Sequence, residues 1–311
     1  MLRKIVKHGG STLTISLPIK WAKKNHLNAG DEIEIAESSH NLVIKGTSKP
    51  GKREIKLDVS GTNKMLSRII TSIYRVGFDK LTLYYKTSQE LEAIQNLVYK
   101  YCHVYEIINI EKNKIVIKSI SQLNPANFDE ILKKATQATL NIAWEIYEAM
   151  RKCDYNALSN IILKDKLIDR YVAYCSRIIN CGYELNYRHK GPLYLIIEQI
   201  EASADVFKVI CRQVVEKKLK LNNEYLDFFG DIIRFMELQL DSIFNFSLNR
   251  IKEIGESEIQ IKNKINEICA GPQQDTKLLA YFINLFETAF EIKNAIICLR
   301  HECLNEMPKS K

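Results

Sequence analysis

The sequence predicts a multidomain α+β protein with three regions of different character. Residues 1–47 carry short runs of alternating apolar and polar residues, a pattern typical of half-buried strands. Residues 54–119 alternate strand-like and helix-like segments, which indicates a small middle α/β domain. From Pro125 onward glycine and proline become rare and apolar residues recur at helical spacing, so we expect an all-α C-terminal region. A chain of 311 residues has room for two to three domains.

The first region is expected to contain short strands and one helix. Pro18 ends the second strand and begins the helix, where the missing N–H of proline is harmless. Gly30 and Asp31 supply the turn into the third strand. Because a segment below about 50 residues is marginally stable alone and no cysteine precedes Cys102, we expect a second copy of the chain to complete its core. The expected strands are Lys4–Lys7, Leu13–Leu17, Asp31–Ala36 and Leu42–Lys45, and the helix is Ile19–Asn25.

The same region is strongly basic at its start. Residues 1–30 hold six basic side chains and no acidic one. A dimer would gather twelve positive side chains on one small body, which suits binding to a phosphate backbone. The chain as a whole has a formal net charge of +8, but the rest of this excess is spread thinly. The six side chains are Arg3, Lys4, Lys7, Lys20, Lys23 and Lys24.

The first region resembles the AbrB/MazE/SpoVT swapped-hairpin family, over about 45 of the 311 residues. The resemblance implies that two chains interleave their hairpins into one β-barrel, an obligate homodimer whose basic face binds duplex DNA. The family's usual arginine in the turn region is replaced here by Gly-Ser-Thr, which leaves a base-reading arginine unassigned. The residues that match the family pattern are Arg3–Lys7, Gly9–Gly10, Leu13–Pro18, Trp21 and Gly30–Asp31–Glu32–Ile33.

DNA binding assigns roles to the basic and hydroxyl side chains of this region. Lysines would contact phosphates, and hydroxyls would add hydrogen bonds. Lys23 and Lys24 have an alternative role as the solvated face of the helix, and Trp21 is expected in the core rather than stacked on a base. The predicted DNA-binding residues are Arg3, Lys4, Lys7, Ser11, Thr12, Thr14, Lys20, Lys23 and Lys24.

A turn-rich, charged linker at residues 47–53 leads into a second region, residues 52–121. Thr87 followed by Glu90 suits a helix start, and Gly77 suits a helix end. The region has no Gly-rich phosphate loop and no nucleophile beside a base. Two roles therefore stay open, a spacer or dimer contact and a ligand sensor. The expected order is strand Glu54–Val59, helix Thr62–Val76, strand Lys80–Tyr85, helix Ser88–Tyr101 and a hairpin of Val104–Ile110 with Lys114–Ser119.

Cysteine usage and hydropathy indicate an intracellular protein. The eight cysteines form no C-x-x-C motif, and most sit among apolar residues, as buried thiols do in a reducing cytosol. The N-terminus does not read as a signal peptide, and no apolar run approaches the roughly 20 residues of a membrane span. We therefore expect a cytoplasmic protein without membrane insertion.

The third region is expected to be a duplicated pair of three-helix bundles, residues 125–219 and 220–306. Two Gly-Pro pairs, 80 residues apart, each precede an apolar helix. An alignment of the two halves with an offset of 86 superimposes Glu201 on Glu287 and Asp205 on Glu291, which indicates a repeat. The expected helices are Asn127–Lys152, Tyr155–Gly182, Leu193–Leu219, Asn222–Asn249, Ile251–Ala270 and Thr276–Glu306.

Pairs of carboxylates on these helices are the candidate functional groups of the third region. Asp165 falls where the seam of its helix favours an apolar residue, and Asp169 follows one turn later. Glu201 and Asp205 form a similar pair on the next helix. Carboxylates close to a core stay ionised when paired with cations or a metal, and an all-oxygen set suits Mg²⁺, Mn²⁺ or iron, with zinc as a further option. The alternatives are a solvated acidic stripe or pairing with Lys164, Lys166 and Arg170.

The order and spacing of these motifs resemble PhoU, the phosphate-uptake regulator, over about 180 residues. Members of that family bind multinuclear metal clusters at E/D-x-x-x-D motifs and modulate phosphate transporters and sensor kinases. The resemblance implies a divalent or trivalent metal ion (Fe, Zn, Mn or Mg) here. In the second repeat Lys262 aligns with Asp169 and would oppose a cation, so the second site is expected to be weaker. The first site is Asp165, Asp169, Glu201 and Asp205, and the second is Glu258, Glu287 and Glu291.

Two functions follow from these patterns. The first is a DNA-binding transcriptional regulator of phosphate uptake, of the type expected in archaea, whose bundles sense metal or a partner protein. The alternative is a PhoU-type adaptor that contacts a phosphate transporter ATPase or a kinase, with the first region serving only to dimerise. An enzyme is not expected, because di-iron bundles need Glu-x-x-His motifs and no histidine of the helical region has a glutamate three residues before it.

Overall fold

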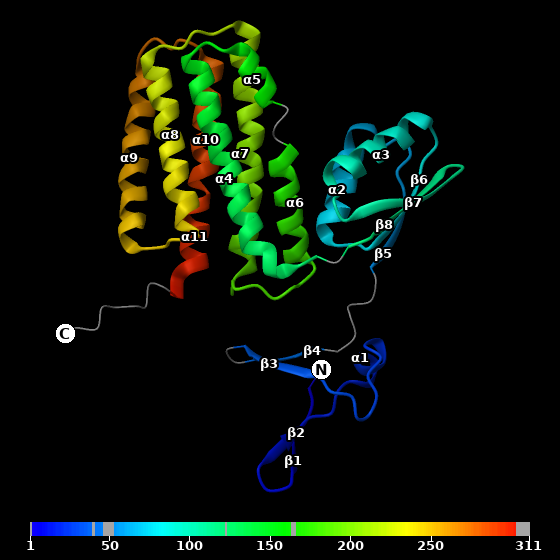
Figure 1. Ribbon diagram of the computed structural model, residues 1–311. Helices are drawn as coiled ribbons and strands as arrows, with labels where there is room; N and C mark the ends of the chain where they lie inside the picture. The colour runs from blue at the N-terminus through cyan, green and yellow to red at the C-terminus, as the bar shows by residue number, and fades with distance from the viewer. Residues whose placement is uncertain (1, 39–40, 46–52, 122, 163–165, 303–311) are drawn as a thin grey trace, which may run out of the picture. The chain divides into compact units, whose positions relative to one another are not determined.

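The computed structural model describes residues 2–38, 41–45, 53–121, 123–162 and 166–302. The chain divides into two units, residues 1–55 and 56–311 (Figure 1). Nearly all of the linker predicted at residues 47–53 lies outside the described residues.

The first unit consists of two short hairpins and one helix. β1 (Val6–His8) pairs antiparallel with β2 (Thr12–Thr14), and β3 (Glu34–Ser38) pairs antiparallel with β4 (Asn41–Lys45). α1 (Ile19–Lys24) follows Pro18, as predicted, and Pro18 has a φ of −63° that suits a helix start.

All four predicted strands of the first unit have different bounds in the structure, and β4 begins one residue early, at Asn41. β1 begins at Val6 rather than Lys4, and β2 ends at Thr14 rather than Leu17, because the pairing of Val6 with Thr14 is the last in the hairpin. β3 begins at Glu34 rather than Asp31. Asp31 is held in the preceding turn, where its carboxylate accepts a hydrogen bond from the backbone N–H of Asn28 at 2.7 Å.

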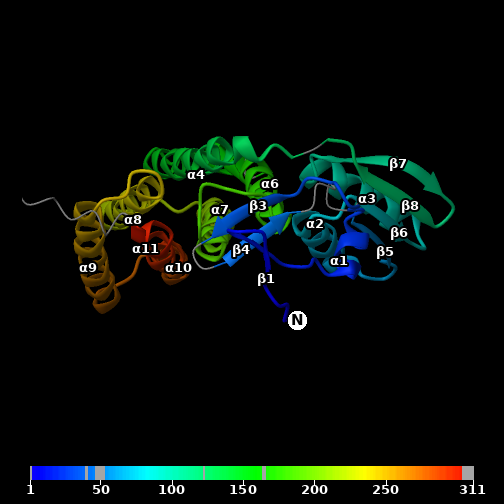
Figure 2. The same cartoon turned by 90° about the horizontal axis from the view of Figure 1, so that it is seen from below.

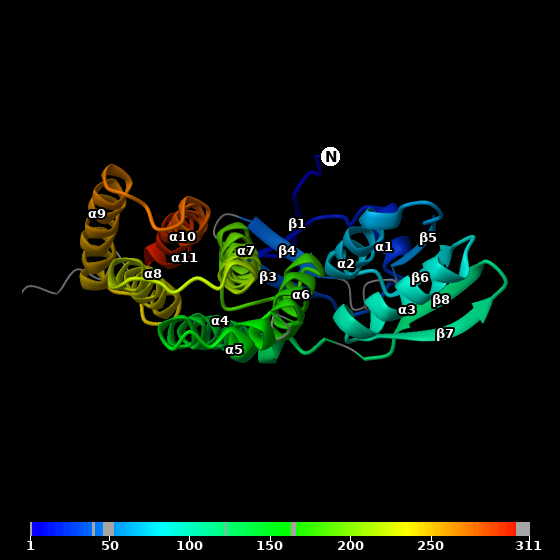
Figure 3. The same cartoon turned by 90° about the horizontal axis from the view of Figure 1, so that it is seen from above.

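Residues 54–119 form a four-stranded sheet with strand order β5-β6-β8-β7. Helices α2 and α3 lie on the same side of this sheet (Figure 3). Every element predicted here is present, although the helix predicted from Thr62 begins with a 3₁₀ turn, Asn63–Met65. The bounds are β5 Glu54–Asp58, α2 Leu66–Val76, β6 Lys80–Tyr84, α3 Ser88–Tyr101, β7 Tyr105–Glu111 and β8 Lys114–Ser119.

The predicted helix ends of this region are confirmed in detail. Thr87 caps α3 by accepting the backbone N–H of Glu90, and the Glu90 carboxylate accepts the N–H of Thr87 in return, which completes a capping box. Gly77 ends α2 with a φ of 97°, a left-handed conformation that glycine adopts without strain.

The rest of the described chain is helical. α7 lies at its centre and packs against α4, α5, α6, α10 and α11 (Figures 2 and 3). Among the described helices, none has the length and hydrophobicity needed to span a membrane. The bounds are α4 Phe128–Arg151, α5 Tyr155–Ile161, α6 Lys166–Asn180, α7 Lys190–Lys217, α8 Asn223–Ser242, α9 Leu248–Ala270, α10 Thr276–Phe290 and α11 Ile292–Arg300.

Four predicted helices need correction. The helix predicted over 155–182 is two helices, α5 and α6, on either side of residues outside the description. The helix predicted from Thr276 is divided at Glu291 into α10 and α11. The helix predicted to reach Asn249 ends at Ser242. α9 begins at Leu248 rather than Ile251, because the Ser247 hydroxyl accepts the N–H of Arg250 at 3.2 Å and caps the helix there.

The α/β region and the helices belong to the same unit because α6 packs on α2 and α3. Arg177 of α6 is almost completely buried at this junction, with 2% of its side chain exposed. Its guanidinium donates to the carbonyls of Tyr74 at 2.6 Å and Phe78 at 2.8 Å, at the end of α2. It also donates to the hydroxyl of Tyr105 at 3.2 Å.

Asp275 joins α10 to α7. Its carboxylate caps α10 by accepting the N–H of Leu278 at 2.8 Å. The same carboxylate accepts from two side chains of α7, Gln213 at 3.0 Å and Lys217 at 2.8 Å. Burial alone would raise the pKa of Asp275, but these donors outweigh burial and hold the pKa below its usual value of 3.8.

Replacement of Asp275 should therefore reduce stability in a pH-dependent way. Asp275→Ala removes the cap and leaves buried donors unpaired, so we expect a loss of about 3 kcal/mol in urea unfolding at pH 7. Asp275→Asn keeps a capping side chain and should cost less. The folded-state pKa is depressed, so the ionised carboxylate stabilises the fold above pH 3.8 and this contribution is lost as pH falls below that value. A stability difference between wild type and Asp275→Asn that grew toward low pH would contradict this assignment.

Candidate functional site

The basic residues of the first unit lie on exposed positions. Lys20 and Lys23 of α1 are exposed and three residues apart, so they occupy the same face of the helix. Lys24 completes this face in the sequence, although its side chain is outside the description. Arg3 and Lys4, which precede β1, are also exposed.

The β1–β2 hairpin carries the predicted hydroxyl contacts. Its register pairs His8 with Thr12 and Val6 with Thr14, which places Thr12 and Thr14 on one face of the hairpin. Lys7 pairs with Leu13 and so occupies the opposite face. The Thr14 hydroxyl donates to the Val6 carbonyl at 3.1 Å. Ser11 lies exposed in the loop beside Gly9, which has a φ of 70°.

Many of the described apolar side chains of the first unit are exposed. None of the residues 2–45 whose burial is described is buried. The exposed fractions reach 67% for Leu13, 67% for Ile19 and 63% for Leu42. These residues alternate with polar ones as core residues do, so a single chain supplies only part of a core. Trp21, predicted in the core, is half-buried.

The first predicted metal site is described only in part. Asp165 lies outside the described residues, and Asp169 of α6 is half-buried. Glu201 of α7 accepts a hydrogen bond at 2.5 Å from Arg75 of α2, whose guanidinium also reaches Glu198 at 3.2 Å. Burial raises the pKa of the Glu201 carboxyl above its ordinary value, and Arg75 offsets this only in part.

The remaining predicted ligands meet lysines or solvent. Asp205 pairs with Lys208 at 2.5 Å. Glu258 of α9 pairs with Lys262 at 2.8 Å and with Lys293 of α11 at 2.5 Å. Burial alone would raise the pKa of Glu258, but the two lysines outweigh it and hold the pKa below its usual range. Glu287 and Glu291, the other residues of the weaker second site, are exposed.

The predicted metal sites are therefore not assembled from the carboxylates that are described. Within the part of the chain that the structure describes, no group of three or more His, Cys, Asp or Glu side chains is arranged to hold a metal ion. Because Asp165 is outside that part, metal binding at the first site stays a prediction. Sequence reasoning identified Lys262 as an opposing charge, but it missed Arg75 and Lys293 because long-range ion pairs leave no local pattern.

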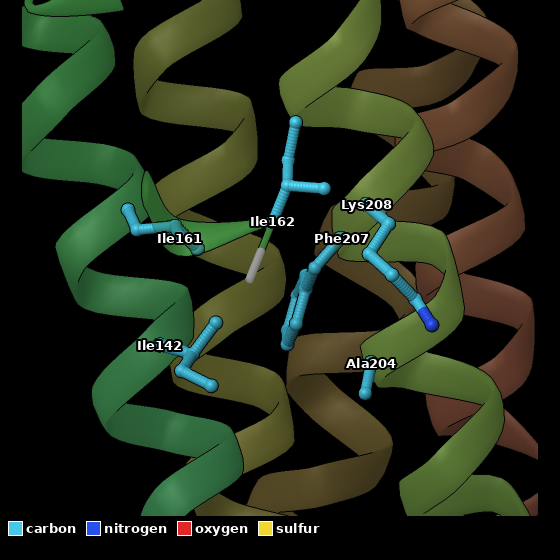
Figure 4. Close-up of a pocket in the computed structure, with 6 residues that line it drawn as sticks. All are labelled: Ile142, Ile161, Ile162, Ala204, Phe207 and Lys208. Atoms are coloured by element: carbon cyan, nitrogen blue, oxygen red, sulfur yellow. The ribbon is translucent and has the colours of Figure 1, made fainter. Parts of the chain in front are cut away.

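A small apolar pocket lies between α4, the end of α5 and α7 (Figure 4). It is lined by residues of α4, α5 and α7, and Lys208 is its charged member. Since Lys208 is paired with Asp205, the pocket offers apolar contact without a catalytic group. The lining residues are Ile142, Ile161, Ile162, Ala204, Phe207 and Lys208.

Comparison with known proteins finds a family similar to the first region. Residues 6–56 match the family model described as antidote-toxin recognition MazE, bacterial antitoxin. Searches of curated proteins and of solved structures found no match. The N-terminal region is thus similar to MazE/AbrB-like domains, which typically bind DNA and dimerise.

Proposed function

We propose that this protein is a DNA-binding transcriptional regulator that acts as a homodimer through residues 6–56. The observation that carries the proposal is the MazE-like match over residues 6–56, which overlaps residues 1–30, a stretch with six basic side chains and no acidic one. Lys20 and Lys23 would contact phosphates from α1, and Thr12 would do so from the hairpin. The hairpin tip carries no arginine, so affinity in this proposal comes mainly from backbone phosphates.

The exposed apolar residues of the first unit support the homodimer. Leu13, Ile19 and Leu42 would be covered by the same residues of a second chain, which would complete the core that one chain lacks. Dimerisation would also double the number of lysines on the DNA-binding body. DNA binding and assembly therefore depend on the same region of the chain but on different side chains in this proposal.

We further propose that the helical region adjusts this DNA binding in response to phosphate status. The support is the resemblance of its repeated helices to PhoU and the order of the regions along the chain. The regulated genes would then be those of phosphate transport. This part of the proposal is independent of whether a metal occupies the carboxylates.

A binding titration tests the proposal directly. The full-length protein is titrated against labelled promoter DNA of phosphate-transport genes at several salt concentrations, and its mass in solution is measured by light scattering. We expect a dimer whose DNA affinity falls steeply with salt. A dimer without salt-sensitive DNA binding would favour the adaptor function, in which the helices contact a transporter ATPase or kinase. A monomer indifferent to DNA would reject both.

A further inference from the structure

The carboxylates of α7 already hold a cation that belongs to the chain itself. Arg75 lies in the last turn of α2 and directs two different nitrogens at two carboxylates, Glu198 at 3.2 Å and Glu201 at 2.5 Å. Side-chain exposure is 17% for Arg75, 37% for Glu198 and 25% for Glu201, so the three groups are screened from water only in part. A guanidinium suits this arrangement because its planar fork can bridge two acceptors.

The junction between the α/β region and the helices fixes Arg75 in this position. Asn180 of α6 donates to the backbone carbonyl of Arg75 at 3.0 Å. Arg177, also of α6, donates to the carbonyls of Tyr74 and Phe78, on either side of the helix end. The backbone of Arg75 is therefore held by α6 while its side chain is held by α7.

This arrangement disagrees with a metal at the same carboxylates. A divalent cation placed between Glu198 and Glu201 would meet the guanidinium of Arg75 at close range, and like charges in a partly buried site repel. The second repeat shows the same feature, because Glu258 is neutralised by Lys262 and Lys293. Glu201 and Glu258 are therefore both paired with basic side chains of the chain itself.

We infer that Glu198 and Glu201 form a cation site whose occupant is the chain's own Arg75, so that docking of α2 through Arg75 and binding of an external divalent cation at these carboxylates exclude each other. The inference rests on residues 56–302 and does not depend on DNA binding. It gives the α/β region a role beyond that of a spacer, because its position is coupled to the charge state of α7.

Mn²⁺ binding to the full-length protein tests this inference. Arg75→Ala vacates the site, and we expect it to bind one additional Mn²⁺ per chain at least tenfold more tightly than wild type, measured by titration with detection of free Mn²⁺ by electron paramagnetic resonance. Arg68→Ala removes an exposed arginine from the same helix and should behave like wild type. Adding Glu198→Gln and Glu201→Gln to Arg75→Ala should abolish the gain.

Two results would overturn the inference. The first is a Mn²⁺ affinity of Arg75→Ala equal to that of wild type, and the second is a gain in affinity that survives removal of both carboxylates. Should Arg75→Ala fail to fold, hydrogen exchange of the wild type gives an independent answer. Millimolar Mn²⁺ should speed exchange in the last turn of α2 at least threefold in wild type and leave a Glu198→Gln/Glu201→Gln variant unchanged. An unchanged wild-type rate in Mn²⁺ would reject the proposed exclusion.

Discussion

A chain that carries Lys20→Glu, Lys23→Glu and Lys24→Glu is expected to lose DNA affinity by about 100-fold or more at moderate salt. A dimer would lose six positive charges from the faces of its two α1 helices and gain six negative ones. Each lost phosphate contact also removes about 0.9 from the slope of log affinity against log salt concentration. The residual binding of the variant should therefore depend less on salt than that of wild type, because Arg3, Lys4 and Lys7 remain. Fluorescence anisotropy with a labelled duplex at several salt concentrations measures both quantities.

A matched variant separates local contacts from total charge. Lys112→Glu, Lys133→Glu and Lys252→Glu change the net charge by the same amount at exposed positions of the second unit. This control should bind DNA within a few-fold of wild type. Light scattering should show the same dimer for all three proteins. Equal losses in the two triple variants would mean that total charge drives the binding and that α1 is the wrong face.

The sequence predicted well those helix starts and ends that are fixed by residues a few positions apart. The capping box of Thr87 and Glu90, the helix end at Gly77 and the helix start after Pro18 all depend on backbone hydrogen bonds or dihedral angles close in sequence. The bounds of β1 and β2 were less accurate, because strand ends depend on where the partner strand stops. The split at Glu291 carried no breaker residue that a pattern could detect.

For the candidate sites, the sequence identified residues that are close together in the chain but not partners that are far apart. The basic residues of the first region could be found from the sequence because they share a short, acid-free segment. The partner of Glu201 could not be found from the sequence, because Arg75 lies 126 positions away. Nothing in the pattern of the Arg75 helix indicates that it packs near α7. The sequence showed that such carboxylates need cations, and the fold decides which cation is in reach.

The contact between α6 and α2 also changes the interpretation of the middle region. A spacer needs only its own core, whereas this region accepts a buried arginine from α6 and sends Arg75 to α7. Two arginines therefore cross the same junction in opposite directions. Arg75 ends on the carboxylates of Glu198 and Glu201, and Arg177 ends on two backbone carbonyls and lies 3.7 Å from Asp79. The junction should therefore respond strongly to the loss of either arginine.

Arg177→Met is expected to lower the free energy of unfolding by about 3 kcal/mol. Methionine fills much of the same volume but donates no hydrogen bond, so the buried carbonyls of Tyr74 and Phe78 lose their donor. The guanidinium also lies 5.0 Å from the ring centre of Tyr74 and 5.1 Å from that of Tyr105, and these cation–π contacts are lost with it. Arg177→Lys keeps the charge but cannot bridge two carbonyls as a fork, so its loss should be intermediate.

Urea denaturation followed by circular dichroism measures these differences, and Arg212→Met, at an exposed position of α7, is the matched control with an expected change below about 0.5 kcal/mol. Hydrogen exchange locates the effect, because loss of Arg177 should speed exchange in α2 and β7 more than in α10, which lies outside the junction. If Arg177→Met were as stable as the Arg212 control, the buried guanidinium would contribute nothing to holding the α/β region on α6. Arg177 would then not be the residue that holds the end of α2 in place for the contact of Arg75 with α7.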